Sequence, residues 1–185
     1  MSEIIKLTTP LKTEDIEKLK AGDRIKLTGK IYTARDMVHR RFMELIKKGE
    51  KLPIDIKGQV LFYVGPAPPK PGYPIGSCGP TTSYRMDKFT PILYEMGLKG
   101  TIGKGKRSKE VREAIKKHNG IYFIATGGVA ALLCKSIKSA KIIAYEDLAT
   151  EAVRELMVED FPLTVGNDCH GGDIFEEGVK KYKIQ

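Results

Sequence analysis

The order of apolar and amphipathic segments after about residue 60 constrains the fold of this chain most strongly. Short apolar runs, which are typical of buried strands, alternate with runs in which apolar residues recur at helical spacing. The predicted elements are, in order, a strand at 59–64, a helix at 83–96, a strand at 100–103, a helix at 108–120, a strand at 121–125, a helix at 129–135 and a strand at 141–145. Such an alternation favours an α/β layer with a partly parallel sheet.

The first third of the chain adds antiparallel material to this layer. Residues 24–34 alternate apolar and polar side chains, which predicts a strand with one face in water. Residues 35–48 predict an amphipathic helix, and Thr13 is the expected N-cap of a short helix earlier in the chain. Residues 150–165 remain ambiguous. Their TEAVREL part favours a helix, whereas FPLTV favours a strand that Pro162 would place at an edge.

Composition bounds the class of protein. The chain has 185 residues, of which 41% are hydrophobic and 30% are charged, and this excludes a disordered chain. We expect one domain over residues 1–185, long enough to bury a core without disulfides or metals. The net charge of +9 admits nucleic acid, membrane surfaces or anionic small molecules as partners, without choosing among them.

The three cysteines, Cys78, Cys134 and Cys169, stand far apart. An odd count without a CxxC pair argues against a disulfide scaffold, so we expect two core thiols, one loop thiol and no metal held by this chain. The longest uncharged stretch, 119–134, is too short to span a bilayer. Because the first residues lack the apolar core of a signal peptide, we expect a cytoplasmic protein.

A long loop rich in glycine and proline leads into the segment GSCGPTTSYRMD at 76–87. Free N–H groups where this loop enters a predicted helix suit an anion. Arg85 lies four residues after Thr81, so on a helix its guanidinium would return to the same end. The equally weighted alternative is that the hydroxyl residues are ordinary caps and that Arg85 is solvated.

Two more basic segments are candidates for binding an anion. The sequence GKGKRS at 103–108 lacks the spacing of a nucleotide P-loop, but Lys104 is suited to a carboxylate. Arg35 opens a predicted helix, where its charge opposes the helix dipole, and this indicates a ligand. His39 is expected at the surface or half-buried rather than in catalysis. No aromatic residues are interleaved with the lysines that follow Lys104, so the signal for nucleic acid is weak.

Five motifs then follow one another in a fixed order, and together they carry a family resemblance. They are ARDxxH from Ala34, GSxGPTTSxRMD from Gly76, KGxRS from Lys104, GGxAALL from Gly127 and VEDFP from Val158. From about residue 4 to residue 176 the chain resembles the beta region of class I fumarate hydratases and L-tartrate dehydratases. The resemblance implies a swivelling three-layer β/β/α domain, with a mostly parallel central sheet and a second antiparallel sheet. In two-subunit members this region is a separate beta chain, and the length of this chain fits that form.

The resemblance also implies an activity. It implies a hydro-lyase, active only as a complex with an alpha subunit, that reversibly hydrates fumarate to L-malate. A four-iron four-sulfur cluster would be held by the alpha subunit and not by this chain. Residue by residue, Thr81 matches the catalytic base of the family, while Arg35, Arg85 and Lys104 match the residues that hold substrate carboxylates. The expected partners are the alpha subunit, in an assembly of two alpha and two beta chains, and a dicarboxylate; neither a membrane nor nucleic acid is expected.

Three alternatives remain open from the sequence. An L-tartrate dehydratase beta subunit would use the same machinery to convert tartrate to oxaloacetate, and the motifs barely separate the two activities. A basic nucleic-acid-binding module would bind DNA or RNA in a salt-dependent manner and would have no diacid chemistry. A chain that only scaffolds a partner would have neither activity.

Overall fold

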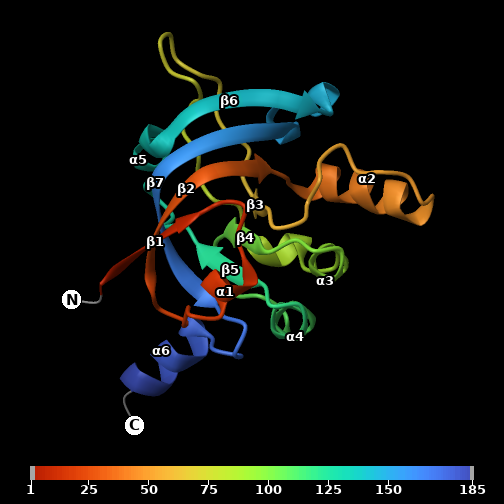
Figure 1. Cartoon of the computed structure of the whole chain (residues 1–185). Coiled ribbons are helices and arrows are strands. Elements are labelled where there is room, and N and C mark those ends of the chain that lie inside the picture. Colours follow the sequence, from red (N-terminus) through yellow and green to blue (C-terminus); the bar gives the residue numbers. More distant parts are fainter. Residues whose placement is uncertain (1–2, 184–185) are drawn as a thin grey trace.

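The strands of this chain form one mixed sheet, and an additional pairing between two of its strands closes part of the sheet into a ring. The computed structural model describes residues 3–183 (Figure 1). The strands are β1 (Ile4–Thr8), β2 (Arg24–Thr33), β3 (Val60–Phe62), β4 (Gly100–Gly103), β5 (Ile121–Ile124), β6 (Ile137–Ala144) and β7 (Val153–Asn167). Their order across the sheet is β1-β2-β3-β4-β5-β7-β6, and β2 also pairs with β7.

The sheet combines parallel and antiparallel pairings. Strands β1 to β5 pair as parallel neighbours, whereas β7 runs antiparallel to β2, β5 and β6. Because β7 pairs with both β2 and β5, the strands β2, β3, β4, β5 and β7 form a closed ring of pairings. Because β2 to β5 run parallel, their carboxyl ends lie at one edge of the sheet. Ligands bind at this edge in parallel α/β sheets.

The helices are short, and three of them lie on the same side of the sheet. The α-helices are α1 (Thr13–Ile16), α2 (Asp36–Lys47), α3 (Thr90–Glu95), α4 (Lys109–Lys117), α5 (Ala130–Leu133) and α6 (Ile174–Tyr182); the 3-10 helices are η1 (Ser83–Met86), η2 (Cys134–Ser136) and η3 (Glu146–Glu151). Figure 1 shows α2, α3 and α4 stacked beside β3, β4 and β5. Between residues 3 and 183, no helix has the length and apolar character that crossing a bilayer requires.

Two hydrophobic cores lie on the two faces of the sheet. Along β3, Val60 and Phe62 face the core inside the ring, while Leu61 faces the core beneath the helices. This alternation follows from the two-residue period of a strand. The inner core also holds Ile31, Ile102, Phe123 and Phe161, and the outer core holds Phe42, Tyr63, Leu93, Val111 and Tyr122. Because both faces are covered, the short strands have continuous apolar sequences rather than alternating ones.

The structure confirms the α/β class, the strand predicted at 24–34 and the helix predicted at 35–48. The helix predicted at 108–120 is α4, and its N-cap is Ser108, whose hydroxyl accepts a hydrogen bond from the Val111 N–H. The predicted helix at 83–96 is divided into η1 and α3, with Pro91 in the first turn of α3. Near the N-terminus, the N-cap of α1 is Lys12 and not Thr13.

The helical interpretation of TEAVREL is wrong for most of the segment. Thr150 and Glu151 end η3, but β7 begins at Val153, where cross-strand packing outweighs helix propensity. Pro162 marks an edge only locally, because β7 as a whole has neighbours on both sides. Strand β6 pairs with β7 up to Val158, and β5 pairs with it from Thr164 onward. Pro162 lies between these two pairings. On the side of β7 that faces β6 and β5, no strand within residues 3–183 is present at Pro162 to need its missing N–H.

Candidate functional site at the carboxyl ends of the parallel strands

The segment that carries Thr81 lies between the ends of β3 and β4. The Thr81 N–H donates to the carbonyl of Tyr63 at 2.7 Å, and the Lys104 N–H donates to the carbonyl of Thr81 at 3.2 Å. Gly103 permits this approach, because a Cβ there would lie 2.0 Å from Ser83 Oγ. The backbone thus holds Thr81 and Lys104 side by side at the carboxyl edge of the sheet.

The side chains of Thr81 and Lys104 are free for a ligand. The Thr81 side chain is half-buried and that of Lys104 is exposed. Within residues 3–183, neither side chain makes a hydrogen bond or an ion pair.

Arg35 reaches the same edge from the end of β2. It is the N-cap of α2, and its guanidinium covers Gly65, where a Cβ would lie 2.5 Å from Arg35 Nη1. Gly65 follows Val64, which pairs with Pro80, the residue before Thr81. The Arg35 side chain is about one-fifth exposed. A half-buried cation therefore lies over the end of β3, close to the segment that carries Thr81.

Arg85 joins this group through a carboxylate. Arg85 Nε donates to Asp36 Oδ1 at 3.0 Å, and Arg85 Nη2 lies 3.0 Å from Asp36 Oδ2. Asp36 Oδ2 also lies 3.9 Å from Arg35 Nη2, which in turn is 3.4 Å from Glu151 Oε1. We call Arg35, Asp36, Arg85 and Glu151 the edge cluster. It contains two positive and two negative charges.

The edge cluster is incompletely hydrogen-bonded. Arg35 Nε is a buried donor, and Asp36 Oδ2 a buried acceptor, with no well-aligned hydrogen-bond partner in the part of the chain that the structure describes. Buried polar atoms in proteins are nearly always paired, so unpaired ones need a specific explanation. Arg35 Nε is itself inaccessible, so a ligand would reach this cluster through the exposed atoms of Arg35 and Arg85.

Thr81 lies outside the helix predicted from residue 83, and that helix begins as a 3-10 turn. Thr81 precedes η1, a 3-10 helix of four residues whose N-cap, Thr82, makes no side-chain cap bond. Ser83 is not a cap either, because its hydroxyl is 3.0 Å from that of Tyr122. Thr81 and Arg85 therefore do not share a helix face. Backbone pairing places Thr81, and the bond to Asp36 places Arg85.

A second arginine cluster, which the sequence interpretation missed, lies buried beneath the edge. Arg107 Nε donates to Asp87 Oδ1 at 2.7 Å, Nη1 donates to Thr101 Oγ1 at 2.9 Å and Nη2 donates to Thr90 Oγ1 at 3.0 Å. Its guanidinium also lies 4.9 Å from the ring centre of Tyr122. In the sequence, Arg107 belongs to a run of basic residues that predicts a solvated face, so no periodic signal marks it as buried. We call this group the buried cluster.

His39 is completely buried, so its expected position at or near the surface is wrong. Helix α2 presents Val38, His39 and Phe42 to the outer core. His39 Nδ1 donates to the carbonyl of Arg35 at 2.8 Å. Burial lowers the pKa of His39 to about 4, so the ring is neutral near pH 7. Its role is to fix the backbone at Arg35, the residue that opens the edge cluster.

With this geometry established, comparison with known proteins shows the family. The family model described as "Fumarase C-terminus" matches residues 1–178. The chain belongs to this family. It is 39% identical over 181 residues to "Fumarate hydratase class I, anaerobic" from Escherichia coli (strain K12), covering 96% of this chain and 33% of that protein.

Two further relatives differ in how much of their length the fumarase C-terminal region occupies. "Fumarate hydratase 2" from Leishmania major is 39% identical over 166 residues, covering 89% of this chain and 29% of that protein. "Putative L(+)-tartrate dehydratase subunit beta" from Methanocaldococcus jannaschii is 39% identical over 177 residues, covering 92% of this chain and 91% of that protein. The chain thus spans about a third of the two fumarate hydratases and nearly all of the subunit.

Two cysteines of this fumarase C-terminal chain, Cys78 and Cys169, are buried core thiols, and Cys134 is half-buried. Cys78 is buried, and burial raises the pKa of its thiol to about 12. Burial likewise raises the pKa of the Cys169 thiol. Metal ligation requires the thiolate, which both environments disfavour. Among residues 3–183, no group of three or more His, Cys, Asp or Glu side chains is placed to hold a metal ion.

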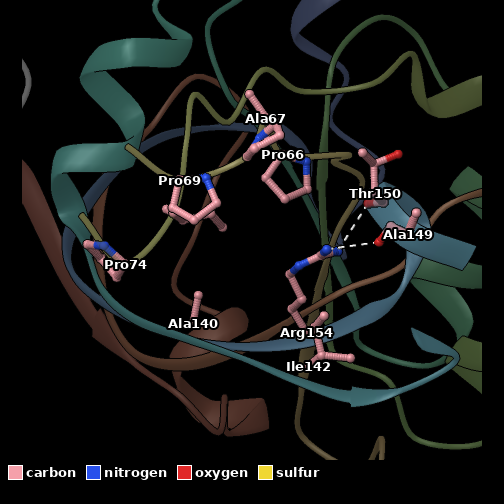
Figure 2. Close-up of a pocket in the computed structure, with 11 residues that line it drawn as sticks. Pro66, Ala67, Pro69, Pro74, Ala140, Ile142, Ala149, Thr150 and Arg154 are labelled. Atoms are coloured by element: carbon pink, nitrogen blue, oxygen red, sulfur yellow. Dashed lines mark hydrogen bonds between the residues drawn. The ribbon is translucent and has the colours of Figure 1, made fainter. Parts of the chain in front are cut away.

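A pocket of about 430 Å³ lies beside the edge cluster, beneath the proline-rich loop (Figure 2). Its walls include Pro66, Ile75 and Ile142, and Arg154 lies at one side. The Arg154 guanidinium donates to the carbonyls of Ala149 and Thr150 at 2.8 and 3.1 Å. Because backbone carbonyls occupy this cation, the pocket is not suited to a dicarboxylate. None of the four candidate site residues lines it.

Proposed function

We propose that this chain is the beta subunit of a class I fumarate hydratase, a hydro-lyase that interconverts fumarate and L-malate in a complex with an alpha subunit. One observation supports this most strongly. Arg35, Thr81, Arg85 and Lys104, which span 70 positions of sequence, come to one edge of the sheet through Asp36 and through backbone pairing. Three of them are cations: Arg35 and Arg85 share the carboxylates of Asp36 and Glu151, and Lys104 makes no ion pair within residues 3–183.

The three cations fit the charges of the substrate. Fumarate and malate each carry two carboxylates, and arginine binds a carboxylate through two parallel hydrogen bonds. Arg35 and Arg85 would hold the substrate in this way, and Lys104 would contribute a point charge. The net charge of +9 further favours an anionic substrate.

Thr81 is the proposed base. Removing a proton from C3 of malate builds negative charge on the substrate, and cations already in place stabilise that charge without reorganising. A threonine hydroxyl is a poor base in water, so its alkoxide needs positive charge nearby. Lys104 is the proposed source of this charge, because its backbone N–H donates to the Thr81 carbonyl and its side chain is exposed at the same edge.

We place the four-iron four-sulfur cluster of this enzyme class on the alpha subunit. The residues of this chain do not fit the cluster, because burial keeps Cys78 and Cys169 protonated. We further propose a cytoplasmic assembly of two alpha and two beta chains. In it, residues 1–185 form one swivelling domain of β/β/α layers. The two cores on opposite faces of the sheet support this layering.

A second candidate function has a specific observation in its favour. The relative that this chain matches over nearly its whole length carries the name of a tartrate dehydratase beta subunit. Tartrate is also a dicarboxylate, so the same arginines would bind it, and its product would be oxaloacetate. The two activities differ in the hydroxyl groups of the substrate and not in the charges that this chain supplies.

Co-expression with the neighbouring alpha-type gene tests the proposal. The complex is assayed with malate, fumarate and tartrate under anaerobic conditions, and the chain alone is assayed in parallel. We expect the complex to hydrate fumarate and the chain alone to be inactive and colourless. Preference for tartrate would favour the second candidate. Tight, salt-dependent binding of DNA or RNA without diacid turnover would refute both.

A further inference from the structure

We infer that Asp36 is a positioning residue of this site, which aligns Arg85 so that one edge of its guanidinium remains available to a substrate carboxylate. The inference rests on the proposed function and deepens it. Asp36 occupies Nε and Nη2 of Arg85, the side edge of the guanidinium. The end edge, formed by Nη1 and Nη2, is left for a second two-pronged contact.

Arg85 needs such an anchor because of where it lies in the fold. It sits on the four-residue η1, and its side chain is 44% exposed. Within the described chain, all hydrogen bonds and ion pairs of its side chain go to Asp36. A free arginine side chain loses rotamer entropy when it is ordered on binding. An anchor that orders it beforehand removes much of that cost.

Asp36 is itself firmly held. It is the first residue of α2, where a carboxylate is favoured by the positive end of the helix dipole. The backbone before it is fixed by the bond from His39 Nδ1 to the Arg35 carbonyl. Its side chain is only 21% exposed. Asp36 is therefore fixed by a packed helix, and its hydrogen bonds fix the position of an arginine on an exposed turn.

Asp36 also allows two arginines to lie close together. It lies 3.0 Å from Arg85 Nη2 and 3.9 Å from Arg35 Nη2. Without its charge, the two guanidinium groups would repel one another and separate. With its charge, the carboxylate of Asp36 lies within 4 Å of both guanidinium groups and offsets their repulsion.

The same helix offers a matched control. Arg41, one to two turns along α2, forms a two-pronged pair with Asp147. Asp147→Asn therefore removes a carboxylate from an arginine of α2 at a position with no proposed part in binding. The test variant is Asp36→Asn, which keeps the shape of the side chain and loses its charge.

Steady-state kinetics of the alpha–beta complex test the inference. We expect Asp36→Asn to raise KM for the preferred diacid about 10- to 100-fold, the size of one hydrogen bond to a charged group. We expect kcat to change less than about threefold, because the base is untouched. Asp147→Asn should leave both constants at wild-type values, and the melting temperatures of all three complexes should agree.

A second readout reports on Arg85 directly. In nitrogen-15 spectra of the full chain, the Arg85 Nε–H signal, assigned by its loss in Arg85→Lys, should be shifted and protected from exchange. It should lose that protection in Asp36→Asn and keep it in Asp147→Asn. This measurement needs neither the alpha subunit nor turnover.

Each other outcome overturns the inference. An unchanged KM would mean that Arg85 needs no anchor, and a lower KM would mean that Asp36 competes with the substrate. A fall in kcat with a loss of melting temperature would reduce Asp36 to a structural residue. A wild-type complex inactive on all three diacids would refute the proposed function itself, a result distinct from any difference between variant and wild type.

Discussion

The edge cluster and the buried cluster each include a residue of one short turn, and the two side chains point in opposite directions, one to the surface and one to the interior. Arg85 points to the edge cluster, where it pairs with Asp36. Asp87, two residues later, points inward and pairs with Arg107 in the buried cluster. Met86, between them, is completely buried. The RMD tripeptide of the motif thus contributes one residue to each cluster.

The difference between the clusters lies in how fully they are satisfied. Each nitrogen of the Arg107 guanidinium has a hydrogen-bond partner, and its side chain is inaccessible to water. In the edge cluster, Arg35 Nε has no partner within residues 3–183, and the Arg85 side chain is nearly half exposed. The satisfied buried cation stabilises the fold, whereas the partly exposed arginines of the edge cluster are accessible to a ligand. The comparison predicts separate consequences for stability and for activity.

The largest expected effect is on turnover at the edge. Thr81→Ala should lower kcat of the alpha–beta complex by about 10²- to 10⁴-fold, the usual contribution of a general base, with little change in KM. Thr82→Ala is the matched control, because Thr82 is the adjacent hydroxyl and makes no side-chain cap bond. Turnover and melting temperature are measured on the same preparations. Near-normal turnover of a stable Thr81→Ala complex would remove Thr81 from the mechanism.

In the buried cluster the effect should be on stability. Arg107→Met keeps much of the side-chain volume but leaves Asp87 buried without its cation. Breaking a buried pair in this way costs about 3–5 kcal/mol of unfolding free energy. Urea unfolding of the full chain measures it. Arg85→Met is the comparison, and should cost less than about 1 kcal/mol because its ion pair is exposed. Equal losses in the two variants would erase the distinction between the clusters.

A smaller effect should appear on acidification, through His39. Burial lowers its pKa in the folded chain to about 4, against an ordinary value of 6.5. Below pH 6.5 the unfolded chain takes up a proton that the folded chain does not accept until about pH 4. The stabilisation is therefore complete above pH 6.5 and declines by about 3 kcal/mol as pH falls to 4.

Urea unfolding at several pH values measures this decline, and His39→Phe is the control that removes the titrating group. The difference between the two proteins isolates His39 from the carboxylates, which titrate in both. A wild-type pH profile parallel to that of His39→Phe would mean that the ring is hydrated and not buried.

Local sequence signals predicted the elements whose pattern matches their surroundings. The strand at 24–34 and the helix at 35–48 have clear periodicities, and Ser108 is an ordinary cap. Strand β1 was missed because its five residues include a charged lysine and gain stability only by pairing with β2. TEAVREL has helix-forming residues, but long-range pairing with β2 and β6 decides its conformation. Non-local pairing of this kind leaves no local signal.

The candidate site divides in the same way. The motifs identified Arg35, Thr81, Arg85 and Lys104, and their roles stay predictions. How they are held could not be predicted from local patterns, because the link from Arg85 to Asp36 crosses 49 positions. Arg107 was missed for a related reason. A buried arginine is recognised by the partners that surround it, and Asp87, Thr90 and Thr101 come from separate segments.

The central claim is that the edge cluster binds a dicarboxylate, and the kcat/KM of Arg85→Lys in the alpha–beta complex tests it most directly. Lysine keeps the charge but loses the two-pronged contact. Arg112→Lys is the control, since Arg112 bridges the carboxylates of Asp173 and Glu176 elsewhere on the surface. We predict that Arg85→Lys lowers kcat/KM for the preferred diacid at least about tenfold at an unchanged melting temperature, while Arg112→Lys does not. Equal values for the two variants and the wild type would contradict the account.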